Sequence, residues 1–185
     1  MIQEKTINKT IICVIALTGL LLFSNTKVTA QSDFKVGGSV SYGILTDLSV
    51  STSFGPGGTG SITIDNPQSI GIRGEGIYPF SDKFRSTLDV AFFFGDEDKA
   101  LDNWLGINAN VQYLFSSEGV KPYLLAGVNF VNISTTNGNS DSSIGLNTGG
   151  GLEFTTDFGG IFIESNWAIS DQGQFNSNGG VRFDI

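Results

Sequence analysis

The sequence has 185 residues, among them 25 glycines, one cysteine and no histidine. Only 15% of the residues are charged, against about 25% in an average soluble domain, and the formal net charge is −8. This composition excludes histidine-dependent catalysis, a histidine metal site and an internal disulfide, and the acidic balance argues against a nucleic-acid-binding surface.

The chain begins with a predicted secretory signal peptide over residues 1–30. Lys5 and Lys9 supply a positive start, and the run from Ile11 to Phe23 is mainly apolar. Val28-Thr29-Ala30 provides the small residues that a signal peptidase requires, so cleavage is expected before Gln31. An uncleaved anchor is the alternative, but the apolar run is shorter than the roughly 20 residues of a spanning helix.

The rest of the chain, residues 31–185, is predicted to be a single domain. Since the signal contains three lysines and one glutamate, this domain keeps 7 basic and 17 acidic residues, a net charge of −10. Apolar residues recur at every second position, which predicts strands. In chain order we expect eight of them, over residues 34–44, 70–78, 84–94, 104–115, 121–130, 144–154, 161–169 and 178–185.

Each predicted strand has about ten residues, which is the length that a tilted strand needs to cross a bilayer. Short connections are expected at residues 79–83, 116–119 and 155–159, and longer ones at 46–68, 95–103, 134–142 and 170–177. This alternation is typical of transmembrane barrels. The fold class is therefore predicted to be all-β, an eight-stranded antiparallel up-and-down transmembrane β-barrel with both termini periplasmic.

The alternation alone does not say which face of the strands is inside, because a soluble lipocalin-like barrel would turn the apolar face inward. Three features favour the membrane arrangement: the polar face consists mostly of small residues, its charges balance, and aromatic residues gather near the short-turn ends. Buried charge is costly unless it is paired. We therefore expect a lumen filled by an ion-pair network rather than an open pore, formed by Lys35, Arg73, Glu75, Arg85, Asp89, Lys121, Glu153, Glu164, Arg182 and Asp184.

The end of the chain, Gly180-Val181-Arg182-Phe183-Asp184-Ile185, resembles the C-terminal assembly signal of small outer-membrane β-barrel proteins of Gram-negative bacteria, of the OmpX and OmpA transmembrane-domain type. Lys121-Pro122-Tyr123-Leu124-Leu125-Ala126-Gly127-Val128 is similar to a recurrent strand of these barrels. The resemblance implies an outer-membrane location and insertion by the barrel-assembly machinery. It also implies that Gly180, Phe183 and Ile185 act as the assembly signal, although this family more often ends in Phe or Trp.

The residues available for chemistry are few. Without histidine, a Ser-His type of catalytic site cannot be built, so we expect no enzymatic activity and no cofactor. The acidic loop 95–103 offers a weak candidate for calcium in Asp96, Asp98 and Asp102, but it lacks the pattern of an EF-hand loop. A solvated acidic loop is the alternative that we favour.

The functional prediction is a non-enzymatic outer-membrane barrel with a structural or surface-interaction role, in envelope integrity or loop-mediated adhesion. Its expected partners are outer-membrane lipid and lipopolysaccharide, with no nucleic acid, and the protein is expected to be monomeric. The alternative is a secreted soluble barrel that binds an apolar small ligand. The longest loop, 46–68, has a glycine-rich tip at Gly55–Gly60 between two stretches of apolar alternation, which predicts either a protruding hairpin or a flexible loop.

Overall fold

A computed structural model describes residues 34–46, 48–53, 59–64, 66–96, 101–136, 138–170 and 173–185. The predicted signal peptide, 1–30, and its cleavage site lie outside the described residues. Among the described residues there is no helix that is long and apolar enough to cross a membrane.

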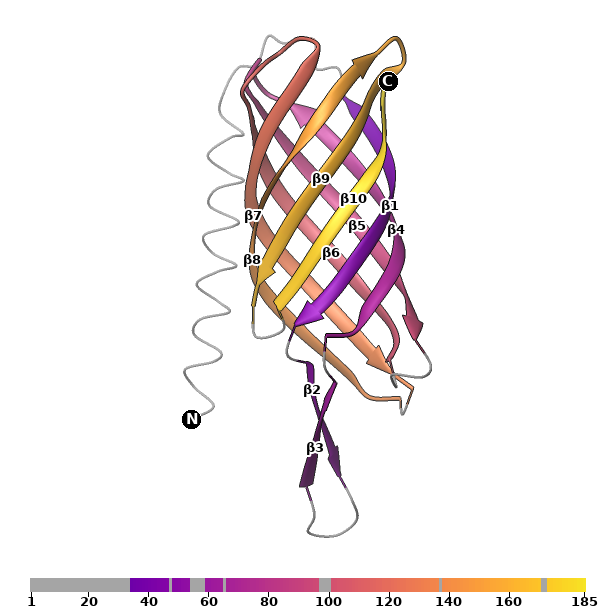
Figure 1. Cartoon of the computed structure of the whole chain (residues 1–185). Coiled ribbons are helices and arrows are strands. Elements are labelled where there is room, and N and C mark those ends of the chain that lie inside the picture. The colour runs from indigo at the N-terminus through magenta and orange to yellow at the C-terminus, as the bar shows by residue number, and fades with distance from the viewer. Residues whose placement is uncertain are drawn as a thin grey trace. The chain divides into compact units, whose positions relative to one another are not determined.

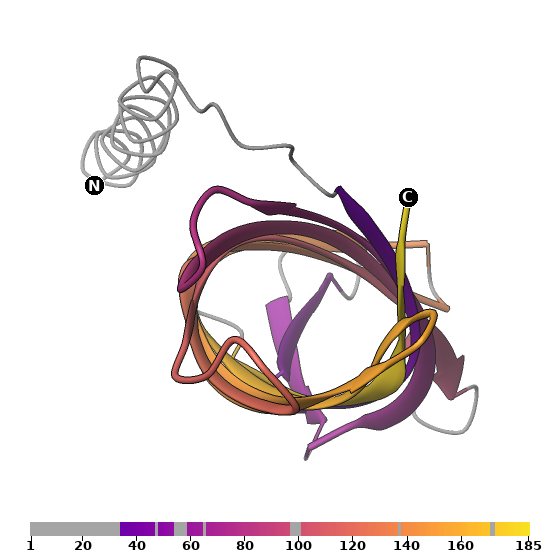
Figure 2. The same cartoon turned by 90° about the horizontal axis from the view of Figure 1, so that it is seen from above.

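Eight strands close into a barrel, in which every strand is antiparallel to both neighbours (Figures 1 and 2). They are β1 (Lys35–Thr46), β4 (Gln68–Pro79), β5 (Phe84–Asp96), β6 (Leu101–Leu114), β7 (Val120–Thr135), β8 (Ser140–Thr156), β9 (Gly159–Ile169) and β10 (Gly173–Asp184). The last strand pairs with the first, from Lys35 opposite Asp184 to Thr46 opposite Gly173. Closure gives every strand a neighbour on both sides, so the barrel has no open edge. The predicted eight-stranded antiparallel barrel is confirmed.

Three of the four predicted long connections, 95–103, 134–142 and 170–177, are shorter in the structure than we predicted. β7 and β8 contain 16 and 17 residues, so that residues 136–139 alone connect them. In the same way, β10 begins at Gly173 and takes in residues up to Ser177 that we assigned to a loop. These stretches are rich in Ser, Asn and Gly, which suggested turns, but their backbone groups pair with the neighbouring strand, and pairing across the ladder overrides local preference.

The first long connection differs from the others. Its strands β2 (Leu48–Ser53) and β3 (Thr59–Ile64) form a separate two-stranded sheet between the end of β1 and the start of β4. The register pairs Leu48 with Ile64 and Val50 with Ile62. The structure therefore contains the hairpin that we predicted there, at the end of the barrel opposite the turns 80–83, 115–119 and 157–158 (Figure 1).

The two faces of the barrel wall differ in chemistry. Leu88, Leu124 and Ile163 point outward and are each more than half exposed. Asn110, Gln112 and most of the charged strand residues point inward and are buried. The predicted arrangement, with the apolar face outside and the polar face inside, is confirmed, and it is the reverse of a soluble ligand-binding barrel.

Candidate functional site: the barrel lumen

Arg182 of β10 is the centre of a charged cluster in the half of the lumen nearest the short turns. Its Nε donates to Glu75 Oε1 at 2.8 Å, and its Nη1 donates to Glu153 Oε2 at 2.6 Å. The guanidinium group also lies 4.0 Å from the ring centroid of Phe162, which covers its flat face. The side chain is completely buried, so these contacts replace all of its hydration.

Two more arginines extend the cluster across the lumen. Arg73 of β4 reaches Glu164 Oε1 at 2.6 Å through Nη1 and Glu75 Oε2 at 3.0 Å through Nη2, and its Nε lies 3.2 Å from Asp89 Oδ1. Arg85 of β5 donates to Glu153 Oε2 at 2.7 Å. Each arginine thus joins strands that are far apart in the sequence, and the network crosslinks the inside of the barrel.

Neutral side chains add hydrogen bonds to the cluster. Tyr123 donates its hydroxyl to Glu164 Oε2 at 2.9 Å, and Gln112 donates to the same oxygen at 3.2 Å. Gln112 in turn accepts a hydrogen bond from Arg85 Nε at 2.7 Å. A carboxylate oxygen that accepts several hydrogen bonds is well stabilised in a low-dielectric interior.

Glycines on the neighbouring strands leave the room that these large side chains occupy. A Cβ atom at Gly37 would lie 2.6 Å from Glu75 Oε1, and one at Gly151 would lie 2.6 Å from the Tyr123 hydroxyl. The high glycine content of the chain is therefore in part a requirement of a narrow lumen, where small and large residues must face each other.

Three of the ten predicted network residues lie outside the cluster. Lys35 and Asp184 form an ion pair with each other at the rim, where the Asp184 side chain is 54% exposed. Lys121 is half-buried and forms no ion pair with any described residue. The structure brings the other seven together: Arg73, Glu75, Arg85, Asp89, Glu153, Glu164 and Arg182.

Next to the charged cluster, amide side chains form a belt around the inner wall. The hydrogen bonds run from Ser41 to Asn178, from Asn178 to Asn166, from Asn166 to Asn147, from Asn147 to Asn110, and from Asn129 to Asn108, with distances of 2.6–3.3 Å. Asn108 also donates to Asp89 at 2.7 Å, which joins the belt to the cluster. These residues were predicted to face inward, but their mutual bonds were not.

The end of the lumen away from the short turns is apolar, which the sequence analysis missed. Phe93 and Trp104 stack with their ring centroids 4.6 Å apart, and five further buried residues surround them: Leu45, Ala91, Leu101, Val131 and Ile133. We call these seven residues the apolar plug. The signal was present, because Trp104 and Ala91 occupy positions on the polar face of their strands. Large apolar residues on the polar faces of neighbouring strands, here Phe93 opposite Trp104, indicate an apolar stretch of the lumen.

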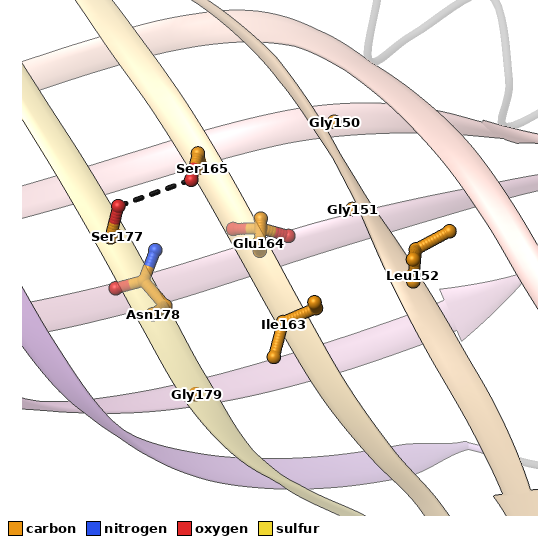
Figure 3. Close-up of a pocket in the computed structure, with 9 residues that line it drawn as sticks. All are labelled: Gly150, Gly151, Leu152, Ile163, Glu164, Ser165, Ser177, Asn178 and Gly179. Carbon is orange, nitrogen blue, oxygen red and sulfur yellow. Dashed lines mark hydrogen bonds between the residues drawn. The ribbon is translucent and has the colours of Figure 1, made fainter.

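An open depression of about 500 Å³ lies on the wall formed by β8, β9 and β10 (Figure 3). Gly150, Gly151 and Gly179 make the wall thin there, and exposed Ile163 lies beside them. The hydroxyls of Ser165 and Ser177 form a hydrogen bond of 3.1 Å with each other on the exposed side. Two polar groups that face an apolar environment can satisfy each other in this way.

The remaining predicted sites are placed as follows. Asp96 ends β5 and Asp102 lies near the start of β6, where Asn103 donates to it, whereas Asp98 lies outside the described residues. No group of three or more acidic, histidine or cysteine side chains suited to a metal ion occurs in the described part of the chain. At the C-terminus, Gly180 packs tightly against β1, Phe183 is outward with its ring 5.6 Å from that of Phe158, and the Ile185 amide donates to the Phe34 carbonyl.

Comparison with solved structures identifies the architecture. Neisserial surface protein A has a TM-score of 0.62 with this chain at 17% sequence identity, and the match covers 83% of this chain and 98% of that one. The chain has the fold of the small outer-membrane β-barrels. The N-terminal β-barrel domain of Pseudomonas aeruginosa OprF gives a TM-score of 0.59 at 15% identity, over 84% of this chain and all of that domain.

A third small barrel of this fold is Ail, the attachment invasion locus protein of Yersinia pestis, with a TM-score of 0.51 at 17% identity over 83% of this chain and all of that one. No protein-family model and no curated sequence matches the chain. The likeness therefore concerns the path of the backbone, and the residues that fill the lumen must be understood from this chain alone.

Proposed function

We propose that this protein is an integral outer-membrane β-barrel without enzymatic activity. The observation that carries the proposal is the apolar outer wall, on which residues such as Val40, Ile72 and Leu88 are each about 57–62% exposed. A continuous apolar belt of this size is unfavourable in water and is what the hydrocarbon core of a bilayer requires.

Aromatic side chains at the short-turn end support the same proposal. Phe84 and Tyr113 lie with their ring centroids 5.1 Å apart, Tyr113 lies 5.1 Å from Phe115, and Phe158 packs on Phe183. Aromatic girdles of this kind occupy membrane interfaces. The short turns lie on this side, and so do the start of β1 and the end of β10. We assign this side to the periplasm.

The contents of the lumen support a closed barrel rather than a pore. The charged cluster, the amide belt and the apolar plug occupy it in succession, and eight strands enclose a space that side chains can fill. We therefore place the function in the envelope and at the cell surface, in structural support or in adhesion through the connections opposite the short turns. The names of two proteins of this fold, a surface protein and an attachment protein, agree with such a role.

The partners that follow are outer-membrane lipid and lipopolysaccharide along the wall, and the barrel-assembly machinery during insertion. We propose that the mature protein is a monomer and needs no cofactor. A secreted lipocalin-like barrel, the alternative from the sequence, would need an apolar cavity inside, whereas the inward residues here are mainly charged side chains and amides.

Localisation tests the proposal. The protein should be recovered in the outer-membrane fraction, require detergent for extraction, and migrate on gels at a position that changes on heating. A fully soluble protein in the absence of detergent would disprove it. For the adhesive role, cells that express the protein should bind surfaces or host cells better than cells expressing a variant without residues 47–65, and equal binding would leave only the structural role.

A further inference from the structure

The buried charges of the lumen do not balance. Three guanidinium groups face four carboxylates, and every one of these side chains is at most 4% exposed: Arg73, Arg85 and Arg182 against Glu75, Asp89, Glu153 and Glu164. Lys35 is paired with Asp184 at the rim, and half-buried Lys121 forms no ion pair with any described residue, so neither lysine joins them. Uncompensated charge in an interior is costly, so the cluster as built lacks one positive charge.

Asp89 is the carboxylate with the least compensation. Its arginine partner is Arg73, whose Nε lies 3.2 Å from Oδ1, and Arg73 is shared with Glu75 and Glu164. Asn108 donates to the same oxygen, Oδ1. The other oxygen, Oδ2, is buried and has no hydrogen-bond donor.

Two other inward residues of β5 and β7 also carry buried oxygens that have no partner. One is Oγ1 of Thr87, which precedes Asp89 by two residues on the inward face of β5. Another is Oδ1 of Asn129, whose amide nitrogen donates to Asn108, the neighbour of Asp89 on β6. Buried oxygens without a partner are rare in folded proteins, and a cation bound at Oδ2 would give one to Asp89.

The groups that surround Asp89 define what this species can be. The charged groups that face it are Arg73 and Glu75 of β4 and Glu164 of β9, and the facing side chains of β6 and β7 are the amides of Asn108 and Asn129. The surroundings thus hold two acids and one shared base. The species bound at Asp89 therefore cannot be an anion, and it cannot be an organic cation that needs a preformed apolar pocket.

We propose that Asp89 holds one small exchangeable cation, a proton or a monovalent metal ion, that completes the charge balance of the lumen. The cation sits at Oδ2, on the side of the carboxylate that Arg73 and Asn108 leave free. This inference goes beyond the proposed envelope role, because it concerns the inside of the barrel and does not depend on what the wall or the loops contact.

Linkage gives the size of the expected effect. The folded barrel binds one cation at Asp89, whereas the unfolded chain at neutral pH leaves this carboxylate ionised and free. Unfolding therefore releases the cation, and the folding equilibrium constant should fall about tenfold for each tenfold fall in the activity of that cation, as long as the folded site is occupied.

The test measures the urea unfolding of the refolded barrel in lipid vesicles for the wild type, Asp89→Asn and the matched control Asp82→Asn, which changes the same charge on the exposed turn between β4 and β5. One series raises the pH from 5 to 8 at constant salt. A second replaces Na⁺ by tetramethylammonium at constant pH and ionic strength. If the cation is a proton, the wild type and Asp82→Asn should lose stability in the pH series. If it is a metal ion, they should lose stability in the Na⁺ series. Asp89→Asn should be insensitive to both.

Equal sensitivity of Asp89→Asn and the wild type in both series would overturn the proposal, as would insensitivity of all three proteins. If Asp89→Asn does not refold, carbon-13 NMR of the wild type labelled at its aspartate carboxyls decides. One buried carboxyl resonance that responds to pH or to Na⁺ separately from the exposed aspartates supports the site. Resonances that all respond together contradict it.

Discussion

The two ends of the lumen solve the same packing problem with opposite chemistry. Near the short turns, Arg182 and its carboxylate partners fill the space with charge, and the geometry is fixed by hydrogen bonds of 2.6–2.8 Å. Toward the hairpin end, Phe93 and Trp104 fill it with stacked rings. Both ends lie on inward positions of the same strands, so alternation decides only that a residue is inside and leaves open what kind of residue it is.

The difference has an energetic meaning. A charged cluster is stable only when it is complete, since loss of one member leaves its partners charged and buried. An apolar cluster loses contacts in proportion to the volume that is removed. Substitutions in the two ends should therefore differ in how much stability they cost and in how that cost depends on the remaining neighbours.

Arg182→Leu should be the most damaging change, with a loss of about 5 kcal/mol in the free energy of unfolding, because Glu75 and Glu153 would remain buried without their main partner. The measurement is urea unfolding after refolding into vesicles. The double variant Arg182→Leu with Glu75→Gln should recover part of the loss. No recovery would mean that lost packing, and not stranded charge, is responsible.

Trp104→Ala should cost about 4 kcal/mol, since it opens a cavity beside Phe93 in the apolar plug. Here a second truncation, Phe93→Ala, should add a smaller penalty than it has alone, because the stacking partner is already gone. The same unfolding assay measures both. A loss for Trp104→Ala of less than about 1 kcal/mol would indicate that this end of the lumen is loosely packed or wet.

Ile163→Arg places a charge on the outer wall near the middle of β9 and should cost about 3 kcal/mol in a bilayer. Val120→Arg is the matched control, since Val120 is the first residue of β7 at the short-turn end of the outer wall, and the penalty should fall to about 1 kcal/mol or less near the interface. Folding efficiency in vesicles reports both. Equal tolerance of the two variants would contradict the membrane assignment of the wall.

Asp184→Asn should have the smallest effect, below about 1 kcal/mol, although it removes the ion pair with Lys35. The pair lies at the rim, where water screens both charges. The comparison with Arg182→Leu, two residues away on the same strand, measures how much burial alone changes the value of an ion pair. A loss as large as that of Arg182→Leu would show that the rim is closed to water.

Much of the fold follows from the printed sequence. The period of two, the placement of Pro79 to Lys83 and of Ser116 to Gly119 between strands, and the acidic and basic residues on the polar face were sufficient to predict eight strands and which side of each is inward. The predicted loops 134–142 and 170–177 were too long, since a Ser- and Asn-rich stretch carries turn signals whether or not a neighbouring strand is available to pair with it.

The sequence by itself determined the side on which each residue lies, because in a strand the direction of a side chain depends only on whether its position is odd or even. The tertiary structure alone decided which inward residues meet. Glu75 and Arg182 are more than a hundred positions apart and come together through the closure of β10 on β1 and of β1 on β4. Charge counting could anticipate a balanced lumen, but the surplus acid at Asp89, the amide belt and the apolar plug depend on register and on barrel closure, which place residues of every strand around one narrow space.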